Sequence, residues 1–247
     1  YAFWMGIFYS LIGFFSALLI FGANVGLMAV AFTSILLIPT LNKLLQEEEN
    51  AEIRENTLSL RLLFKDHRDV FEVYLFVFIG VFLTHAILSV AFASRVTSLF
   101  SPQLAVAGIT GQAMGSGVFV SILLNNLLVL VVCFILSLVY GAGAVIFLTW
   151  NASVWGSIVG YYILQVSETG LSPANTFLVI LLPLLPHMIT ETLGYLSASI
   201  VGGVVSKAVT REKLMSKKFM HVLTDALLFL GLGFILIIIA AALESFI

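Results

Sequence analysis

The chain has 247 residues, of which 61% are hydrophobic and only 10% are charged, and its formal net charge is −2. Soluble domains carry about 25% charged and about 45–50% apolar residues, so this composition excludes a water-soluble enzyme and a disordered chain. The chain offers no basic face for nucleic acid, and its single cysteine, Cys133, excludes a disulfide framework and a thiolate metal cluster. A polytopic helical protein of the lipid bilayer remains, because the apolar runs are continuous rather than alternating.

The apolar runs predict an all-α bundle of about seven spans, since one span needs about 20 mostly apolar residues. The first two form an N-terminal hairpin over 1–44, without the basic start or cleavage site of a signal peptide. A charged amphipathic helix over 45–70 is expected at the membrane surface, followed by a five-span domain over 71–247. The spans are expected at 3–21, 25–44, 71–93, 118–140, 145–164, 174–206 and 221–244.

Two segments depart from a simple span or loop. The sixth apolar stretch is longer than one span needs and contains Pro183 and Pro186, so a kink or break is predicted there. The connection over 94–117 is rich in Gly, Ala and Ser and mildly apolar. Either a re-entrant or interfacial segment or an ordinary surface loop fits its composition.

The basic residues predict the orientation of the chain in a cell membrane. Ten of the eleven follow either the second or the sixth span, and only Arg95 falls on the opposite side. Basic residues gather on the cytoplasmic side, so a cytoplasmic N-terminus and an extracytoplasmic C-terminus are expected. The ten residues are Lys43, Arg54, Arg61, Lys65, Arg68, Lys207, Arg211, Lys213, Lys217 and Lys218.

Polar side chains within the spans are candidate functional residues, because such groups are costly in a bilayer. His187 and Glu191 stand four residues apart and share one helix face, so they form either a structural pair or a proton or ligand site. With His85 they could complete a zinc site, since two imidazoles and a carboxylate are a known catalytic set. No catalytic motif is present, and no cofactor is expected. The full candidate set is His85, Asn125, Asn126, Asn151, His187 and Glu191.

The asparagines and small residues predict helix contacts. Asn125 and Asn126 point about 100° apart, so each can bond a different helix, with Asn151 within reach of one of them. Gly156 and Gly160 have the spacing that lets helices approach closely. Either the packing of the monomer or a homo-oligomer can use that spacing.

These polar residues, in this order, resemble the stage II sporulation protein M family of prokaryotic membrane proteins. The resemblance covers about 71–245 and rests on Phe119–Asn126, a Gly-rich turn, Asn151 with Gly156, Pro186-His187 with Glu191, and the small residues 197–203. The segment 66–72 is similar to archaeal members. Met188 and Ala152 stand where the family usually has glycine, which adds bulk beside His187 and Asn151.

The resemblance implies a membrane scaffold without catalytic activity. In spore-formers the namesake anchors enzymes that degrade peptidoglycan, so other membrane or cell-envelope proteins are the implied partners. The charged segment 45–70 and the basic segment 207–218 are then the expected docking surfaces. The alternatives are a small-solute or ion transporter with a polar site at His187 and Glu191, and an intramembrane metalloenzyme at His85, His187 and Glu191.

Overall fold

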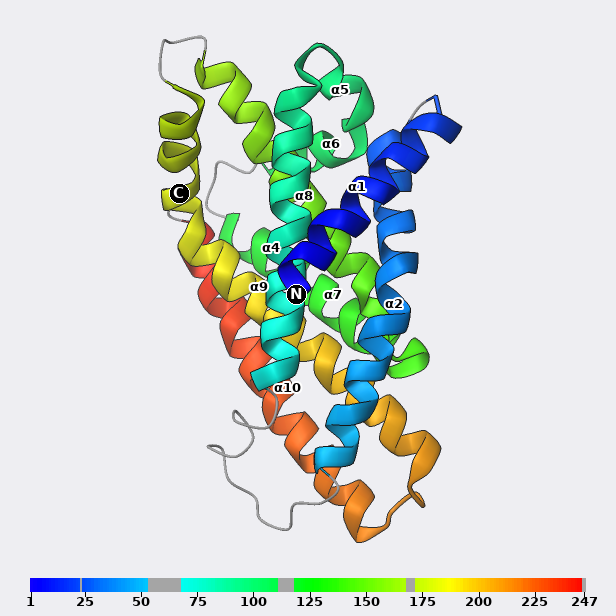
Figure 1. Ribbon diagram of the computed structural model, residues 1–247. Helices are drawn as coiled ribbons and strands as arrows, with labels where there is room; N and C mark the ends of the chain where they lie inside the picture. The colour runs from blue at the N-terminus through cyan, green and yellow to red at the C-terminus, as the bar shows by residue number, and fades with distance from the viewer. Residues whose placement is uncertain (23, 53–67, 111–117, 168–171, 246–247) are drawn as a thin grey trace.

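The computed structural model describes residues 1–22, 24–52, 68–110, 118–167 and 172–245 (Figure 1). These residues form an all-α bundle, and no strand occurs among them. Seven long helices match the seven expected spans. They are α1 (Ala2–Ile20), α2 (Val25–Glu52), α4 (Arg68–Ala91), α7 (Val118–Tyr140), α8 (Val145–Ser167), α9 (Pro173–Arg211) and α10 (Lys217–Glu244).

Six of these helices are long and apolar enough to cross a membrane, and α8 is the exception. The 23 residues of α8 suffice in length, but the helix carries Thr149, Asn151, Ser153 and Ser157. It packs against α4, α9, α2 and α6, so most of its side chains contact protein rather than the surroundings. A helix enclosed in this way needs fewer apolar residues than one that faces lipid.

The predicted break in the sixth span is wrong, because α9 continues as one helix of 39 residues across Pro183 and Pro186. Breaking a helix in lipid would leave several backbone groups without partners, whereas a proline removes only one hydrogen bond. Figure 1 shows that the course of α9 nevertheless bends in its yellow part. The helix starts at Ser172, whose side chain accepts a hydrogen bond from the backbone N–H of Asn175 at 3.3 Å.

The predicted surface helix over 45–70 is only partly described. Residues 45–52 continue α2 without a break, so this part is not a separate helix. Residues 53–67 lie outside the described part of the chain. The end of α2, the start of α4 and the turn between α9 and α10 lie at one end of the bundle, and α5 lies at the other (Figure 1).

The segment over 94–117 forms short helices packed into the bundle as far as residue 110. They are η1 (Ala93–Arg95), α5 (Val96–Leu99) and α6 (Ser101–Thr110). Phe100 and Gln103 are fully buried, and the amide of Gln103 donates to the hydroxyl of Ser153 on α8 at 3.5 Å. This part of the segment is therefore not an exposed surface loop, and residues 111–117 lie outside the described part.

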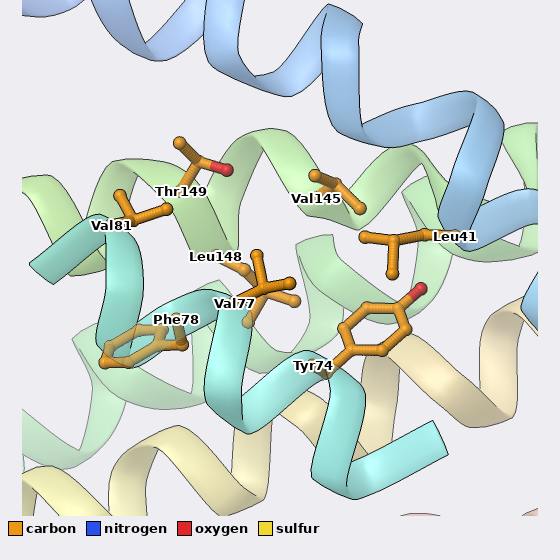
Figure 2. Close-up of a pocket in the computed structure, with 8 residues that line it drawn as sticks. All are labelled: Leu41, Tyr74, Val77, Phe78, Val81, Val145, Leu148 and Thr149. Carbon is orange, nitrogen blue, oxygen red and sulfur yellow. The ribbon is translucent and has the colours of Figure 1, made fainter. Parts of the chain in front are cut away.

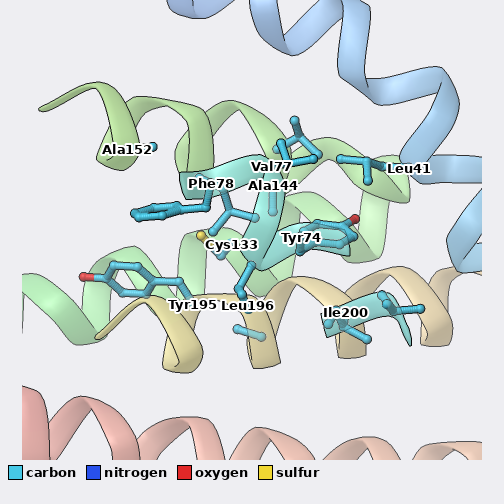
Figure 3. Packing of buried hydrophobic residues seen from close by; sticks show 14 of the residues in the cluster. Leu41, Tyr74, Val77, Phe78, Cys133, Ala144, Ala152, Tyr195, Leu196 and Ile200 are labelled. Carbon is cyan, nitrogen blue, oxygen red and sulfur yellow. The ribbon is translucent and has the colours of Figure 1, made fainter. Parts of the chain in front are cut away.

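The largest apolar core extends from Leu37 and Leu41 on α2 to Ile237 on α10, and the buried apolar residues of α1, Phe14 and Ala17, belong to a second cluster. Figure 3 shows part of the largest core, with Cys133 of α7 among side chains from α4, α8 and α9. Gly156 and Gly160 pack α8 against α4 within the chain: a Cβ on Gly160 would lie 2.6 Å from the carbonyl oxygen of Ala86. These glycines therefore serve the packing of the monomer.

A small cavity of about 10 Å³ lies inside this core between α2, α4 and α8 (Figure 2). It has room for about one water molecule, far below the volume of a pocket for a small solute. The hydroxyl of Tyr74 has no partner within the described structure and points toward Leu41. The lining residues are Leu41, Tyr74, Val77, Phe78, Val81, Val145, Leu148 and Thr149.

Candidate functional site

His85 and His187 lie on different sides of α8. His85 is fully buried on α4, with its Nδ1 3.0 Å from the carbonyl oxygen of Val81 and its side chain against Gly156. The ring of His187, on α9, lies 5.1 Å from that of Trp155. Because Trp155 and Gly156 are consecutive on a helix, they point about 100° apart. The two imidazoles are therefore directed to different faces of α8.

This separation removes the basis of the zinc hypothesis. Within the described residues, no group of three or more His, Cys, Asp or Glu side chains could hold a metal ion. Among the described residues, His85, His187 and Glu191 are therefore not brought together as a set of ligands.

The asparagines differ in their surroundings. Asn125 is exposed on α7 and donates from Nδ2 to Oδ1 of the buried Asn126 at 3.4 Å. Asn151 donates to the carbonyl oxygen of Phe147 on its own helix at 2.8 Å, rather than reaching α7. The Asn151 amide is therefore bonded within α8 and not, as the sequence had suggested, to Asn125 or Asn126.

Glu191 lies among polar groups of three helices. The residue is only 6% exposed, and its carboxyl group interacts electrostatically with the hydroxyl of Tyr195, one turn further along α9. Glu191 interacts electrostatically with Glu244, at the end of α10, and Glu244 lies beside Asn126 on α7. Glu244, which is not among the six candidate residues, therefore lies near both Glu191 and Asn126.

Several buried polar atoms at these positions have no hydrogen-bond partner within the described structure. They include both ring nitrogens of His187, Nδ2 of Asn126 and Nε2 of His85. A buried polar group without a partner costs about 1–3 kcal/mol, so such groups mark a strained or functional position.

Sequence reasoning missed Tyr195, Ser199 and Glu244. The first two continue the four-residue spacing of His187 and Glu191 along α9, and that spacing is the signal that could have found them. Glu244 is the last residue of the span expected at 221–244, and its position in the sequence does not relate it to Glu191. A helical side chain points back toward the N-terminus of its helix, which directs Glu244 into the bundle.

The comparisons with known proteins give one result. The family model of stage II sporulation protein M matches residues 73–247. The chain belongs to this family. The matched region contains α7 to α10 and all six candidate residues, and it leaves the hairpin of α1 and α2 outside. Neither the curated proteins nor the solved structures give a match to this chain.

Proposed function

We propose that this chain is a membrane scaffold without catalytic activity of its own, which binds an integral membrane or cell-envelope partner. Membership of the stage II sporulation protein M family supports a membrane protein of this type. The observation that carries the binding role is the turn between α9 and α10, where basic and apolar side chains are displayed together.

The turn between α9 and α10 has a defined shape. The backbone N–H of Ser216 donates to the carbonyl oxygen of Lys213 at 3.0 Å, and the Ser216 side chain accepts from the N–H of Phe219 at 3.2 Å. Met215 adopts a positive φ of 64°. A non-glycine residue in that conformation needs support from its surroundings, so this turn is a fixed feature rather than a passive link.

The side chains of this turn form a mixed surface. Leu214 is 60% exposed and Met215 is 78% exposed. Four exposed basic residues flank them along the chain, at Arg211, Lys213, Lys217 and Lys218. Exposed apolar side chains between basic ones suit a partner segment that is acidic and amphipathic, because charge steers the encounter and apolar burial holds the complex.

The same turn supports the proposed orientation of the chain in the membrane. It lies at the end of the bundle to which α2 and α4 bring Lys43 and Arg68, whereas Arg95 lies near α5 at the other end. Basic residues concentrate in the cytoplasm, so we place this turn inside the cell and the C-terminus outside. An impermeant thiol reagent on intact cells should label a Ser98→Cys variant and spare Lys213→Cys, both in a Cys133→Ala background. Labelling of Lys213→Cys alone would reverse the orientation.

Photo-crosslinking in the native membrane tests the scaffold. A crosslinking residue at Met215 should give a protein adduct that disappears in a Lys213→Glu, Lys217→Glu double variant. An Arg95→Glu variant at the opposite end should retain the adduct, and a crosslinker at Leu228, exposed on α10, should not form it. Adducts to lipid alone, together with a monomer that purifies without a partner, would overturn the proposal.

A further inference from the structure

A line of polar side chains follows one face of α9, and we call it the α9 polar seam. Its members recur every four residues, and none is more than 6% exposed: His187, Glu191, Tyr195 and Ser199. Residues four apart lie one above the other on a helix. The same spacing then passes through Gly203 and reaches Lys207.

Helix α7 lines the seam with polar groups of its own. The thiol of Cys133 is in side-chain contact with Ser199 and interacts electrostatically with Tyr195. Ser137 lies further along α7, and its Cβ is 2.8 Å from the place of a Cβ on Gly202 of α9. Figure 3 shows Cys133 and Tyr195 within the same buried region. Polar groups therefore continue along the α7–α9 interface.

The two ends of the seam carry ionisable groups. At one end, Glu191 interacts electrostatically with both Glu244 and Tyr195. At the other, Nζ of Lys207 and Oδ1 of Asn42 both lie beside Gly141, in the turn after α7. From His187 to Lys207 the helix rises about 30 Å, which is about the thickness of the hydrocarbon core of a bilayer.

Three members of this interface have unpartnered polar atoms although they are at least nine-tenths buried. They are the two ring nitrogens of His187, Nδ2 of Asn126 and Oγ of Ser137. Simple helix contacts would be expected to pair these atoms, because leaving them unpaired costs stability. Chains of ionisable and hydroxyl groups inside a membrane are typical of proton relays.

We propose that the α9 polar seam conducts protons along the α7–α9 interface, between the Glu191–Glu244 carboxyl pair and the Lys207 end. A proton leaves a carboxyl group and binds a lone pair of the Tyr195 hydroxyl, which releases its own proton onward. The Cys133 thiol and the Ser199 and Ser137 hydroxyls repeat this exchange. No covalent bond between heavy atoms changes, and the transmembrane proton gradient supplies the driving force.

This inference assigns transport with the proton as substrate, and it does not depend on partner binding at the α9–α10 turn. The test uses the purified full chain in lipid vesicles, with a potassium diffusion potential and a pH-sensitive dye inside. The pH inside vesicles that contain the wild-type protein should change faster than the pH inside protein-free vesicles. The applied potential sets the direction of this change. Glu191→Gln and Tyr195→Phe should each slow this flux about tenfold or more, because each removes a proton-transfer group.

Tyr74→Phe is the matched control for Tyr195→Phe. Tyr74 is also buried with an unpartnered hydroxyl, but it lines the small apolar cavity and not the seam. It should keep the wild-type flux, and thermal unfolding of each variant should confirm that the bundle is intact. Wild-type flux equal to that of protein-free vesicles, or equal flux in all variants, would overturn the proposal. Crosslinking at Met215 in the Glu191→Gln variant then reports the scaffold role separately.

Discussion

Gly156 is where α8 approaches α4 most tightly, so Gly156→Ala tests the packing of the bundle. A Cβ at this position would meet the carbonyl oxygen of Phe82, and it would lie 2.9 Å from Cβ of His85 and 3.1 Å from the backbone N of Ala86. Two of these three atoms belong to backbone and cannot rotate away. Forcing an extra carbon into such a contact costs about 1–3 kcal/mol.

Gly231→Ala is the matched control. Gly231 is exposed within α10, and nothing lies within 4 Å of its added Cβ. Both substitutions gain the same helix propensity, about 1 kcal/mol, so the difference between the two variants isolates the overlap at Gly156. That difference corresponds to a Tm lower by about 2–12 °C for a chain of this size.

Cys133 supplies the assay for both variants. It is the single cysteine of the chain and is fully buried, so a thiol-reactive dye reports unfolding on heating in detergent. The Gly156→Ala protein should react at a lower temperature than the Gly231→Ala protein. Equal midpoints for the two variants would refute the close α4–α8 contact.

Three further variants probe other parts of the bundle. Phe229→Ala, at a side chain 1% exposed whose ring lies 5.3 Å from that of Phe71, should lower the free energy of unfolding by about 3–5 kcal/mol, whereas Leu227→Ala at an exposed position should change the thermal midpoint little. Gln103→Leu removes the bond to Ser153 and should speed backbone hydrogen exchange in α6; unchanged exchange would contradict a stabilising role for that amide. Ser216→Ala should destabilise the start of α10 by about 0.5–2 kcal/mol, and Ser216→Asp should restore it, as measured by the thermal midpoint.

Hydropathy predicted the span positions well, because the bilayer sets both the length and the composition of a crossing helix. It was less informative where protein rather than lipid surrounds a helix. The predicted span 145–164 coincides with helix α8, although α8 is not among the six helices apolar enough to cross a membrane. Of the kink and the break that Pro183 and Pro186 allowed, the structure excludes the break, because a local rule about proline does not include the cost of breaking a helix in lipid.

The candidate site was predicted only in part, since its pairing depends on how helices are placed. The sequence identified His187 and Glu191 as one face of a helix, and the structure agrees that both are buried on α9. It could not show that His85 packs against Gly156 and His187 against Trp155, on different faces of α8. It also could not foresee that Asn151 would bond the carbonyl oxygen of Phe147, because an amide within a helix can bond its own chain.

The contact between α7 and α9 along the seam is the central claim, and one disulfide measurement tests it most directly. A Ser199→Cys variant carries two cysteines, which the structure places in side-chain contact across the seam. Ser197→Cys is the control, because the Cβ of Ser197 lies 3.3 Å from the place of a Cβ on Gly233 of α10. Mild oxidation in native membranes, followed by mass spectrometry of the fragments, should find a Cys133 disulfide in the Ser199→Cys protein and none in the Ser197→Cys protein. A Cys133 disulfide in the Ser197→Cys protein alone would contradict the arrangement of α7 and α9.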